Sequence, residues 1–442
     1  MNFKSFIILF SFIVSGCSSS TRVPKGKVIN VKNFGAIGNG IVDDTKAVQK
    51  ALNEGGKIFF PAGIYSVKPV TYISNSEIFG HGDQSILQLR FDTPPVTSDI
   101  QSVLYAANID TGPSYNVHIH DLVIDGNRNN IDWSNIRGDG NGNGITTWGT
   151  KNLEINNVLV KDCWTDGVFV CATRRTTEVH NTEDFRIHDL VINNCGRQGV
   201  SVISANDGRF DDIEIRNITR TSPRAGFDFE PNRKVESIYN IEVSNITIDS
   251  SGQGIAVSGY QNVHDLSFDN ININDVMNQY SFIVTGAYGI EIKDLRVNNA
   301  NGSSTYPTLA VKEAYDVTFS NFELRNCNGP AVIALQRKAG KVLTKAKFEN
   351  FLIDGFDHSA IYQIRPIDEA IFKNGIIRKT KKTVSQYSII VADSENMNLS
   401  NIEIIGSDAP YLISSKAQQL DLKNLKLDKR YKNPIKQATA QK

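Results

Sequence analysis

Basic and acidic side chains able to bind and protonate an anionic substrate gather in the middle of the sequence. Arg197 and Arg224 precede two short alternating runs, and the second run contains Asp228 and Glu230. Residues two apart in a strand lie on one face, about 6 to 7 Å from one another. Guanidinium groups bind carboxylates or sulfates in a bidentate manner, and a carboxyl group beside them can move protons. We therefore take these four side chains as candidate catalytic residues.

These residues lie in repeated units of the sequence, and the structure of the repeats must therefore position them. From about residue 115 onward, each unit has an alternating strand, a polar turn, a glycine or small residue and a second alternating strand. Glycines align at intervals of 23 to 32 residues, namely Gly144, Gly167, Gly199, Gly226 and Gly254. This period, without a second helix in each unit, is typical of a parallel β-solenoid. Equivalent residues of successive coils then stack about 4.8 Å apart, so Arg197 and Arg224 should be neighbours.

Alternation after each glycine predicts which side chains face the interior. The inward positions are Val168, Val170, Val200, Val202, Phe227, Phe229, Ile255 and Val257. Asp228 and Glu230 then point outward, and Asp166 and Gln198 directly precede the glycines of the two preceding coils. We expect Asp166 and Gln198 to contact a substrate beside the four catalytic candidates. A surface ladder of ion pairs is the alternative without a catalytic role.

Three further residues are candidates for substrate contact. Arg175 lies in a long loop between two strands, Tyr260 follows Gly259, and Lys312 follows the strand Thr-Leu-Ala-Val. A long loop on a solenoid usually borders a cleft. Trp133 and Trp148 lie in or near another long loop, where they would stack on sugars or anchor the loop.

The first residues read as an export signal. The apolar run from Phe6 to Val14 is too short to span a bilayer, and Val-Ser-Gly precedes Cys17. This segment resembles the lipobox of bacterial lipoproteins. The resemblance implies that Cys17 carries lipid after cleavage and that the protein is anchored to the outer membrane, on the periplasmic side, with the cell surface as the alternative.

The segment after this signal resembles the opening of a known superfamily. It contains FGAIGNGIVDDTKAVQKAL, then GGKIFFPAGIY, and GHGDQSIL at residues 80–87. These motifs are similar to those of the pectate lyase superfamily. The resemblance implies an all-β fold, a single-stranded right-handed parallel β-helix, with a short helix that caps its N-terminal end. Asp43, Asp44 and Thr45 would supply capping oxygens for that helix. The expected organisation is a signal peptide at 1–16, a linker at 17–27, the β-helix at 28–425 and a tail at 426–442.

Composition excludes two functional classes. Lysine and arginine number 47, as do aspartate and glutamate, and this balance argues against a non-specific nucleic-acid binder. The five cysteines form no CxxC pair and no cluster with histidine at metal-ligand spacing, so a structural zinc site is not expected. Cys163 and Cys195 occupy the same position in two successive repeats. We interpret them as part of an internal ladder of small residues, and a disulfide between them is the alternative.

The superfamily resemblance and the charged residues favour a lyase. It would act by β-elimination on poly- or oligosaccharides that contain uronic acid, with or without sulfate. Arg197 and Arg224 would neutralise the uronate carboxylate while a base removes the C5 proton. If the same elimination expels water from a uronate at the non-reducing end, the enzyme is a dehydratase. The resemblance also makes calcium a candidate cofactor, with Asp166, Asp228 and Glu230 as its ligands.

Two alternatives remain open from the sequence. The first is an inverting glycoside hydrolase in which Asp228 and Glu230 serve as acid and base. Against it, the polygalacturonase motifs Asn-Thr-Asp and Arg-Ile-Lys are missing, and Gly80-His81-Gly82 lies in the N-terminal opening. The second is a lipoprotein that binds glycans without catalysis.

Overall fold

The computed structural model describes a large part of the 442-residue chain. The described residues are 26–96, 102–107, 110–136, 142–173, 178–259, 262–301, 305–336, 344–363, 367–379, 387–391, 396–406, 409–414, 420–427 and 435–438.

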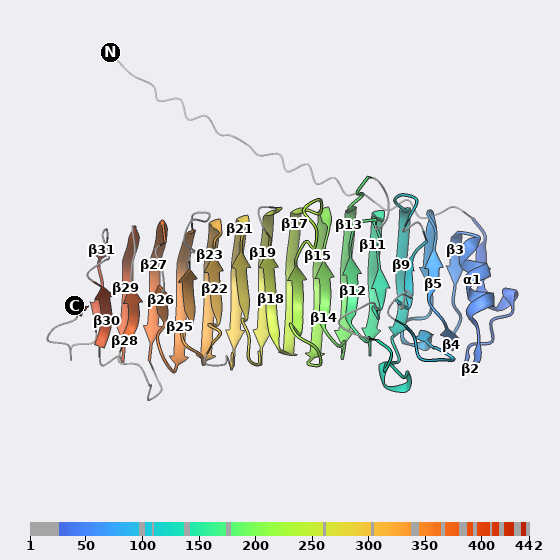
Figure 1. The fold of residues 1–442 in the computed structure, drawn as a ribbon, viewed down its shortest axis with the longest axis horizontal. Coiled ribbons are helices and arrows are strands. Elements are labelled where there is room, and N and C mark those ends of the chain that lie inside the picture. Colours follow the sequence, from blue (N-terminus) through green and yellow to red (C-terminus); the bar gives the residue numbers. More distant parts are fainter. Residues whose placement is uncertain are drawn as a thin grey trace, which may run out of the picture.

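Two long parallel sheets run the length of the molecule (Figure 1). The long-strand sheet has 19 strands: β1 (Val28–Asn30), β2 (Asn39–Asp43), β3 (Gly56–Phe59), β4 (Gly63–Val67), β6 (Ser76–Phe79), β7 (Ser85–Leu89), β9 (Tyr115–Asp125), β11 (Lys151–Lys161), β13 (Thr182–Asn193), β15 (Ala205–Ile218), β17 (Ile238–Ser251), β19 (Val263–Asn274), β21 (Tyr288–Asn298), β23 (Tyr315–Cys327), β25 (Lys345–Phe356), β27 (Glu369–Arg378), β29 (Met397–Ile405), β31 (Leu420–Lys423) and β32 (Lys426–Leu427).

The short-strand sheet has 14 strands: β5 (Val70–Tyr72), β8 (Leu104–Ala106), β10 (Ile145–Thr146), β12 (Asp166–Val170), β14 (Gln198–Val202), β16 (Ala225–Phe229), β18 (Gln253–Ser258), β20 (Phe282–Thr285), β22 (Leu309–Lys312), β24 (Ile333–Gln336), β26 (Ile361–Gln363), β28 (Tyr387–Val391), β30 (Ala409–Ser414) and β33 (Ile435–Ala438). Through the middle of the chain, strands of the two sheets alternate, so each coil contributes one strand to each sheet. β32 and β33 lie within the residues assigned to a tail from the sequence, so paired strands run beyond residue 425.

Asparagine and aspartate bend the long strands. Asn350 has a φ of 55°, and equivalent residues of neighbouring coils share this left-handed conformation. These two residue types tolerate it because their short polar side chains bond locally. The side chains also join the coils: Asn374 donates to Asn350 at 3.1 Å, and Asn350 donates to Asn321 at 3.1 Å. The high asparagine content therefore forms ladders along the solenoid axis.

Inward-facing side chains form one continuous core. Val168, Val200, Phe227 and Ile255 have no exposed surface, as the alternation predicted. Phenylalanines stack between coils farther along, as for Phe319, Phe348 and Phe372, whose successive ring centroids are 5.2 and 4.6 Å apart. Parallel-strand spacing brings such rings into contact.

Two cysteines predicted to share a column are both buried in this core. Cys163 and Cys195 are free thiols, so the structure contains no disulfide between them. Each thiol lies near the backbone carbonyl two residues earlier, that of Lys161 or Asn193. The neighbouring Cys195 and burial raise the pKa of Cys163.

A short helix lies at the N-terminal end, as the sequence predicted. Helix α1 (Thr45–Asn53) buries Val48, Ala51 and Leu52, and Figure 1 shows it beside the first coils. The predicted capping role of Asp44 is wrong, because its carboxylate accepts hydrogen bonds from the Ile37 and Gly38 amides at 2.7 and 3.0 Å. Short 3₁₀ turns occur at Val31–Phe34, Gly82–Gln84 and Arg128–Asn130.

No helix within the described ranges is both long enough and apolar enough to cross a membrane.

The asparagine ladder makes a stability prediction. Asn350→Ala should lower the free energy of unfolding by about 1 to 2 kcal/mol, because alanine disfavours the left-handed backbone and loses two side-chain hydrogen bonds. Asn350→Gly keeps the backbone preference and should cost less. Urea unfolding followed by circular dichroism measures both, and equal losses would show that the backbone conformation contributes nothing.

Candidate active site

The candidate residues lie on the outer face of β12, β14 and β16. The parallel register places Asp166 opposite Gln198, and Ser201 opposite Asp228. Both carboxyl groups are buried, with Asp166 at 0% and Asp228 at 4% exposure. The alternation predicted that Asp228 points outward, but not that neighbouring side chains cover it.

Asp166 and Arg197 form a bidentate ion pair. Arg197 donates from Nε to Oδ1 at 2.9 Å and from Nη2 to Oδ2 at 2.6 Å. Paired charges of this geometry offset much of the cost of burial. The expectation that Arg197 binds the substrate carboxylate is therefore corrected, because its guanidinium fork already holds Asp166.

Asp228 is a buried carboxyl group whose protonation is strongly perturbed. Its pKa is raised to about 8, first by burial and then by the nearby charge of Glu230, while Arg197 opposes the shift. The Gln198 side-chain amide donates a hydrogen bond to Asp228. At neutral pH the carboxyl group therefore retains its proton, as a general acid must.

Glu230 lies two residues beyond Asp228 and is exposed to solvent. Its backbone amide donates to the Val202 carbonyl at 2.9 Å, so it continues the ladder between β14 and β16. Glu230 therefore places an exposed carboxyl group directly after β16, near the buried carboxyl group of Asp228.

Arg224 lies at the position equivalent to Arg197 in the next coil but is oriented differently. Its backbone is left-handed, with φ of 59°. Its Nε is buried and has no hydrogen-bond partner in the described part of the chain. A Cβ on Gly252 would lie 2.6 Å from the Arg224 Cβ, so the glycine leaves room for this side chain.

Farther along the same face, the structure adds a tyrosine that the sequence analysis missed. Lys312 Nζ lies 2.5 Å from the Tyr280 hydroxyl and 4.6 Å from the centre of its ring. Between this pair and Asp228 the outward positions are small or apolar: Ala256, Ile283 and Ala310. Tyr280 was detectable as the residue aligned with Gln253 in the preceding coil. Arg175, Tyr260 and Cys17 lie outside the described residues.

The candidate calcium ligands do not fit a calcium site. Both oxygens of Asp166 accept from Arg197, and Asp228 holds a proton at neutral pH, whereas calcium needs ionised oxygens free to coordinate. Across the described ranges, no group of three or more His, Cys, Asp or Glu residues is placed to hold a metal ion. We therefore derive no chemical step through calcium.

The tryptophans considered as sugar platforms are buried. Trp133 is 5% exposed and donates its indole N–H to the Arg128 carbonyl at 3.1 Å. Trp148 is 8% exposed and contacts Phe169 edge to face. Both anchor the structure, and neither offers an open ring face.

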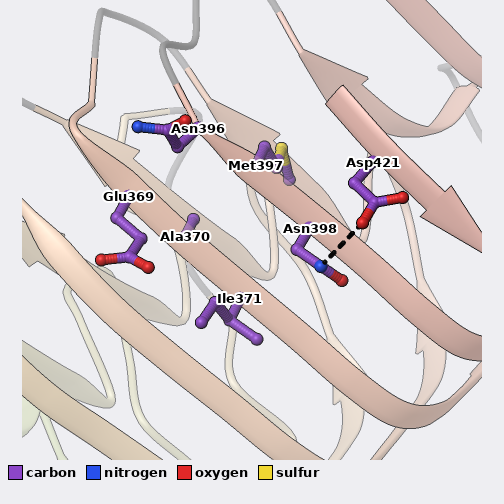
Figure 2. A pocket seen from close by; sticks show the side chains of 7 residues that line it. All are labelled: Glu369, Ala370, Ile371, Asn396, Met397, Asn398 and Asp421. Carbon is purple, nitrogen blue, oxygen red and sulfur yellow. Dashed lines mark hydrogen bonds between the residues drawn. The ribbon is translucent and has the colours of Figure 1, made fainter. Parts of the chain in front are cut away.

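A hollow of about 560 Å³ lies near the C-terminal end, on β27, β29 and β31. Figure 2 shows its polar side chains, including Asn398, which donates to Asp421 at 3.2 Å. The described residues that line it include no lysine, arginine or histidine. Size alone therefore does not make it the better candidate for catalysis.

The fold is that of the right-handed parallel β-helix proteins. A family model described as "Rhamnogalacturonase A/epimerase, pectate lyase-like" matches residues 28–242. The A-module of mannuronan C-5 epimerase AlgE6 from Azotobacter vinelandii has a similar structure, with a TM-score of 0.66 and 16% identity over 91% of this chain and 100% of that module. The parallel β-helix fold and the resemblance to the pectate lyase superfamily, both inferred from the sequence, are confirmed.

Two curated relatives show how varied this class is. The preneck appendage protein of Bacillus phage PZA is 23% identical over 86% of this chain and 47% of its own length. Mannuronan C5-epimerase AlgE1 of Azotobacter vinelandii is 27% identical over 52% of this chain and 16% of its own. The chain thus spans about half of the phage protein and less of the epimerase. Proteins similar to this chain thus include both an epimerase and a phage appendage protein.

Burial of Asp228 makes stability depend on pH. Its pKa is near 3.8 in an unfolded chain and about 8 in the folded protein, so between these values only the folded state holds the proton. Stability should therefore fall as pH rises from about 4 to about 8. Asp228→Asn should flatten this slope in urea unfolding at pH 5, 7 and 9; parallel profiles for the two proteins would contradict the raised pKa.

Proposed function

We propose that the chain is a lyase that acts by β-elimination on uronate-containing oligo- or polysaccharides. The observation that carries the proposal is the protonated, buried Asp228 beside the solvent-exposed Glu230. A buried carboxyl group that retains its proton is suited to be the acid of a reaction in which a nearby exposed carboxyl group is the base.

Asp228 is the general acid of this proposal. Elimination breaks the C4–O bond of the uronate, and the departing oxygen needs a proton. Asp228 carries that proton at neutral pH, and Gln198 holds the carboxyl group in place. A positioned acid of this kind contributes roughly 10²- to 10⁴-fold to a rate.

Glu230 takes the C5 proton, and the C5–H electron pair becomes the C4=C5 double bond as the C4–O pair leaves with the oxygen. Arg224, whose Nε has no hydrogen-bond partner in the described chain, supplies the positive charge that stabilises the C5 carbanion through the uronate carboxylate. When the leaving group is a hydroxyl, the same two proton transfers release water, and the enzyme is a dehydratase.

Similarity to the mannuronan C5-epimerases supports this choice of substrate. Their names describe a reaction at C5 of a uronate polymer, and removal of the C5 proton is the step that elimination shares with epimerisation. The outer face from β12 to β22 spans six strands, about 24 Å at the spacing of parallel strands. That length accommodates several sugar units.

Inverting hydrolysis is the second candidate, because Asp228 and Glu230 are two residues apart on one strand. That spacing is about 6 to 7 Å, close to the range of about 6.5 to 9.5 Å that leaves room for an attacking water. Reducing ends without an unsaturated product would favour this reaction. Glycan binding with no product would favour a non-catalytic binding protein.

The test is an assay of the full chain on alginate, pectic, ulvan and glycosaminoglycan oligosaccharides. A lyase raises ultraviolet absorbance together with reducing ends, and a dehydratase raises absorbance alone. Asp228→Asn and Glu230→Gln should each lower the rate at least 100-fold. Glu291→Gln, an exposed glutamate on the long-strand sheet, is the matched control and should retain full activity.

Absorbance that stays flat on every substrate, with reducing ends increasing, would reject elimination. Exchange of the C5 proton for deuterium without new absorbance would instead indicate an epimerase. Retained turnover in both carboxyl variants would remove these residues from the mechanism.

We also propose a lipid anchor at Cys17 that holds the enzyme at the outer membrane, on the periplasmic side. The support is the sequence Val-Ser-Gly-Cys after a short apolar run. Cys17→Ser should release the protein from the membrane fraction and abolish labelling with radioactive palmitate, while Cys327→Ser should leave both unchanged. Labelling that persists in the Cys17 variant would refute the anchor.

A further inference from the structure

A row of outward-facing side chains continues from Glu230 along the short-strand sheet. Glu230 directly follows β16 and Ser258 ends β18, and the register of these strands makes the two positions equivalent. Ser258 pairs in turn with Thr285, and Thr285 pairs with Lys312. Three steps between coils therefore separate the backbones of Glu230 and Lys312 by about 14 Å. We call these four residues the outer row.

The outer row is accessible to solvent, whereas the row beside it is not. Glu230 is exposed, and the other three residues of the outer row are partly exposed. The positions two residues earlier in each strand are at most 7% exposed: Asp228, Ala256, Ile283 and Ala310. Within the described ranges, the side-chain hydroxyls of Ser258 and Thr285 have no hydrogen-bond partner. A ligand on this face therefore contacts the outer row, where polar groups are available to it.

Lys312 ends the outer row as a cation with one hydrogen-bond partner. Its ammonium group donates to the Tyr280 hydroxyl at 2.5 Å and lies 4.6 Å from the centre of the ring. By contrast, Arg220 over Trp164, an indole on which Trp133 also stacks, lies in the turns. Among the described residues, no carboxylate forms an ion pair with Lys312. Because an ammonium group has three N–H donors, Lys312 retains donors for a ligand.

Tyr280 is held in place by its own neighbours. Its ring packs against the small buried cluster that contains Ala310. Tyr306 contacts it edge to face, with ring centroids 5.0 Å apart. This packing fixes the hydroxyl to which Lys312 is bonded, so the ammonium group is positioned before a ligand arrives. A positioned group loses less conformational freedom on binding than a flexible lysine does.

We infer that Lys312 and Tyr280 form a distal subsite for the carboxylate of a uronate unit other than the one that reacts at Glu230. The carboxylate accepts from the ammonium group and from the tyrosine hydroxyl, while Ser258 and Thr285 bond hydroxyl groups of the sugar units between. A disaccharide does not span a separation of about 14 Å, so the substrate is a linear acidic oligosaccharide of more than two units. This inference rests on the proposed function, because it takes Glu230 as the position of the reacting unit.

Binding of oligosaccharides of two lengths tests the subsite. Dissociation constants are measured at low salt for the full chain with the di- and hexasaccharides of mannuronate and of galacturonate. Lys312→Met should weaken binding of the recognised hexasaccharide about tenfold, because a charge-assisted hydrogen bond is lost. It should thereby remove most of the gain in affinity from the disaccharide to the hexasaccharide. Tyr280→Phe keeps the ring packing but lacks the hydroxyl, and should weaken the hexasaccharide less.

Two controls separate recognition of a carboxylate from a defect in folding. The methyl esters of the hexasaccharides lack the carboxylate charge, so the wild type and Lys312→Met should bind them equally. Lys293→Met removes an exposed lysine from the long-strand sheet, where its ammonium group lies 3.9 Å from Asp269. This variant should bind every probe as the wild type does.

The inference is overturned if Lys312→Met binds the hexasaccharides as tightly as the wild type does, or if it weakens both lengths equally. It is also overturned if the methyl esters lose the same affinity, if Lys293→Met weakens binding equally, or if the wild type binds none of the probes.

Failure of this inference is distinct from failure of the proposed function. A loss that depends on length, with no unsaturated product from the wild type, keeps the subsite and rejects the lyase. Continued elimination by the wild type, with unchanged binding by Lys312→Met, rejects the subsite and keeps the lyase.

Discussion

In-register stacking of successive coils is the constraint on which the rest of the structure depends. Parallel pairing holds equivalent residues of neighbouring coils at about 4.8 Å, as in the pairing of Ser201 with Asp228 and of Asp228 with Ala256. The same spacing stacks phenylalanine rings inside the solenoid and joins asparagine side chains where the strands bend. A register shift of one residue would turn core side chains outward and remove the candidate site together with the core.

Burial on the outer face gives the site its chemical character. A carboxyl group in water is ionised at neutral pH, but Asp228 lies beneath its neighbours and its pKa rises to about 8. Asp166 is buried more completely, yet its bidentate pair with Arg197 supplies the opposite charge. The two buried aspartates thus differ in character, because one has a guanidinium partner and the other an amide.

The turns differ from the sheet in the side chains that they present. The outer face between Asp228 and Lys312 is built of small and apolar residues. Charged and aromatic side chains stand at the margins, with Tyr280 and Lys312 at one end and Arg220 over Trp164 beside the strand ends. The strands provide a repetitive surface, and the irregular turns distinguish one part of it from another.

The sequence by itself determined that the chain forms a solenoid and which side chains of its strands face inward or outward, because a two-residue period specifies the face on which each side chain lies. It also determined that Asp166, Gln198 and Asp228 lie near one another, because the alignment of repeated units specifies the neighbours of each residue in the next coil. Only the tertiary structure decided which partners these residues take. Arg197 had several carboxylates within reach, and its pairing with Asp166 depends on side-chain conformations that a repeat alignment does not contain. The burial of Asp228 and the Trp133–Trp164–Arg220 stack likewise depend on turns of unequal length, which follow no period.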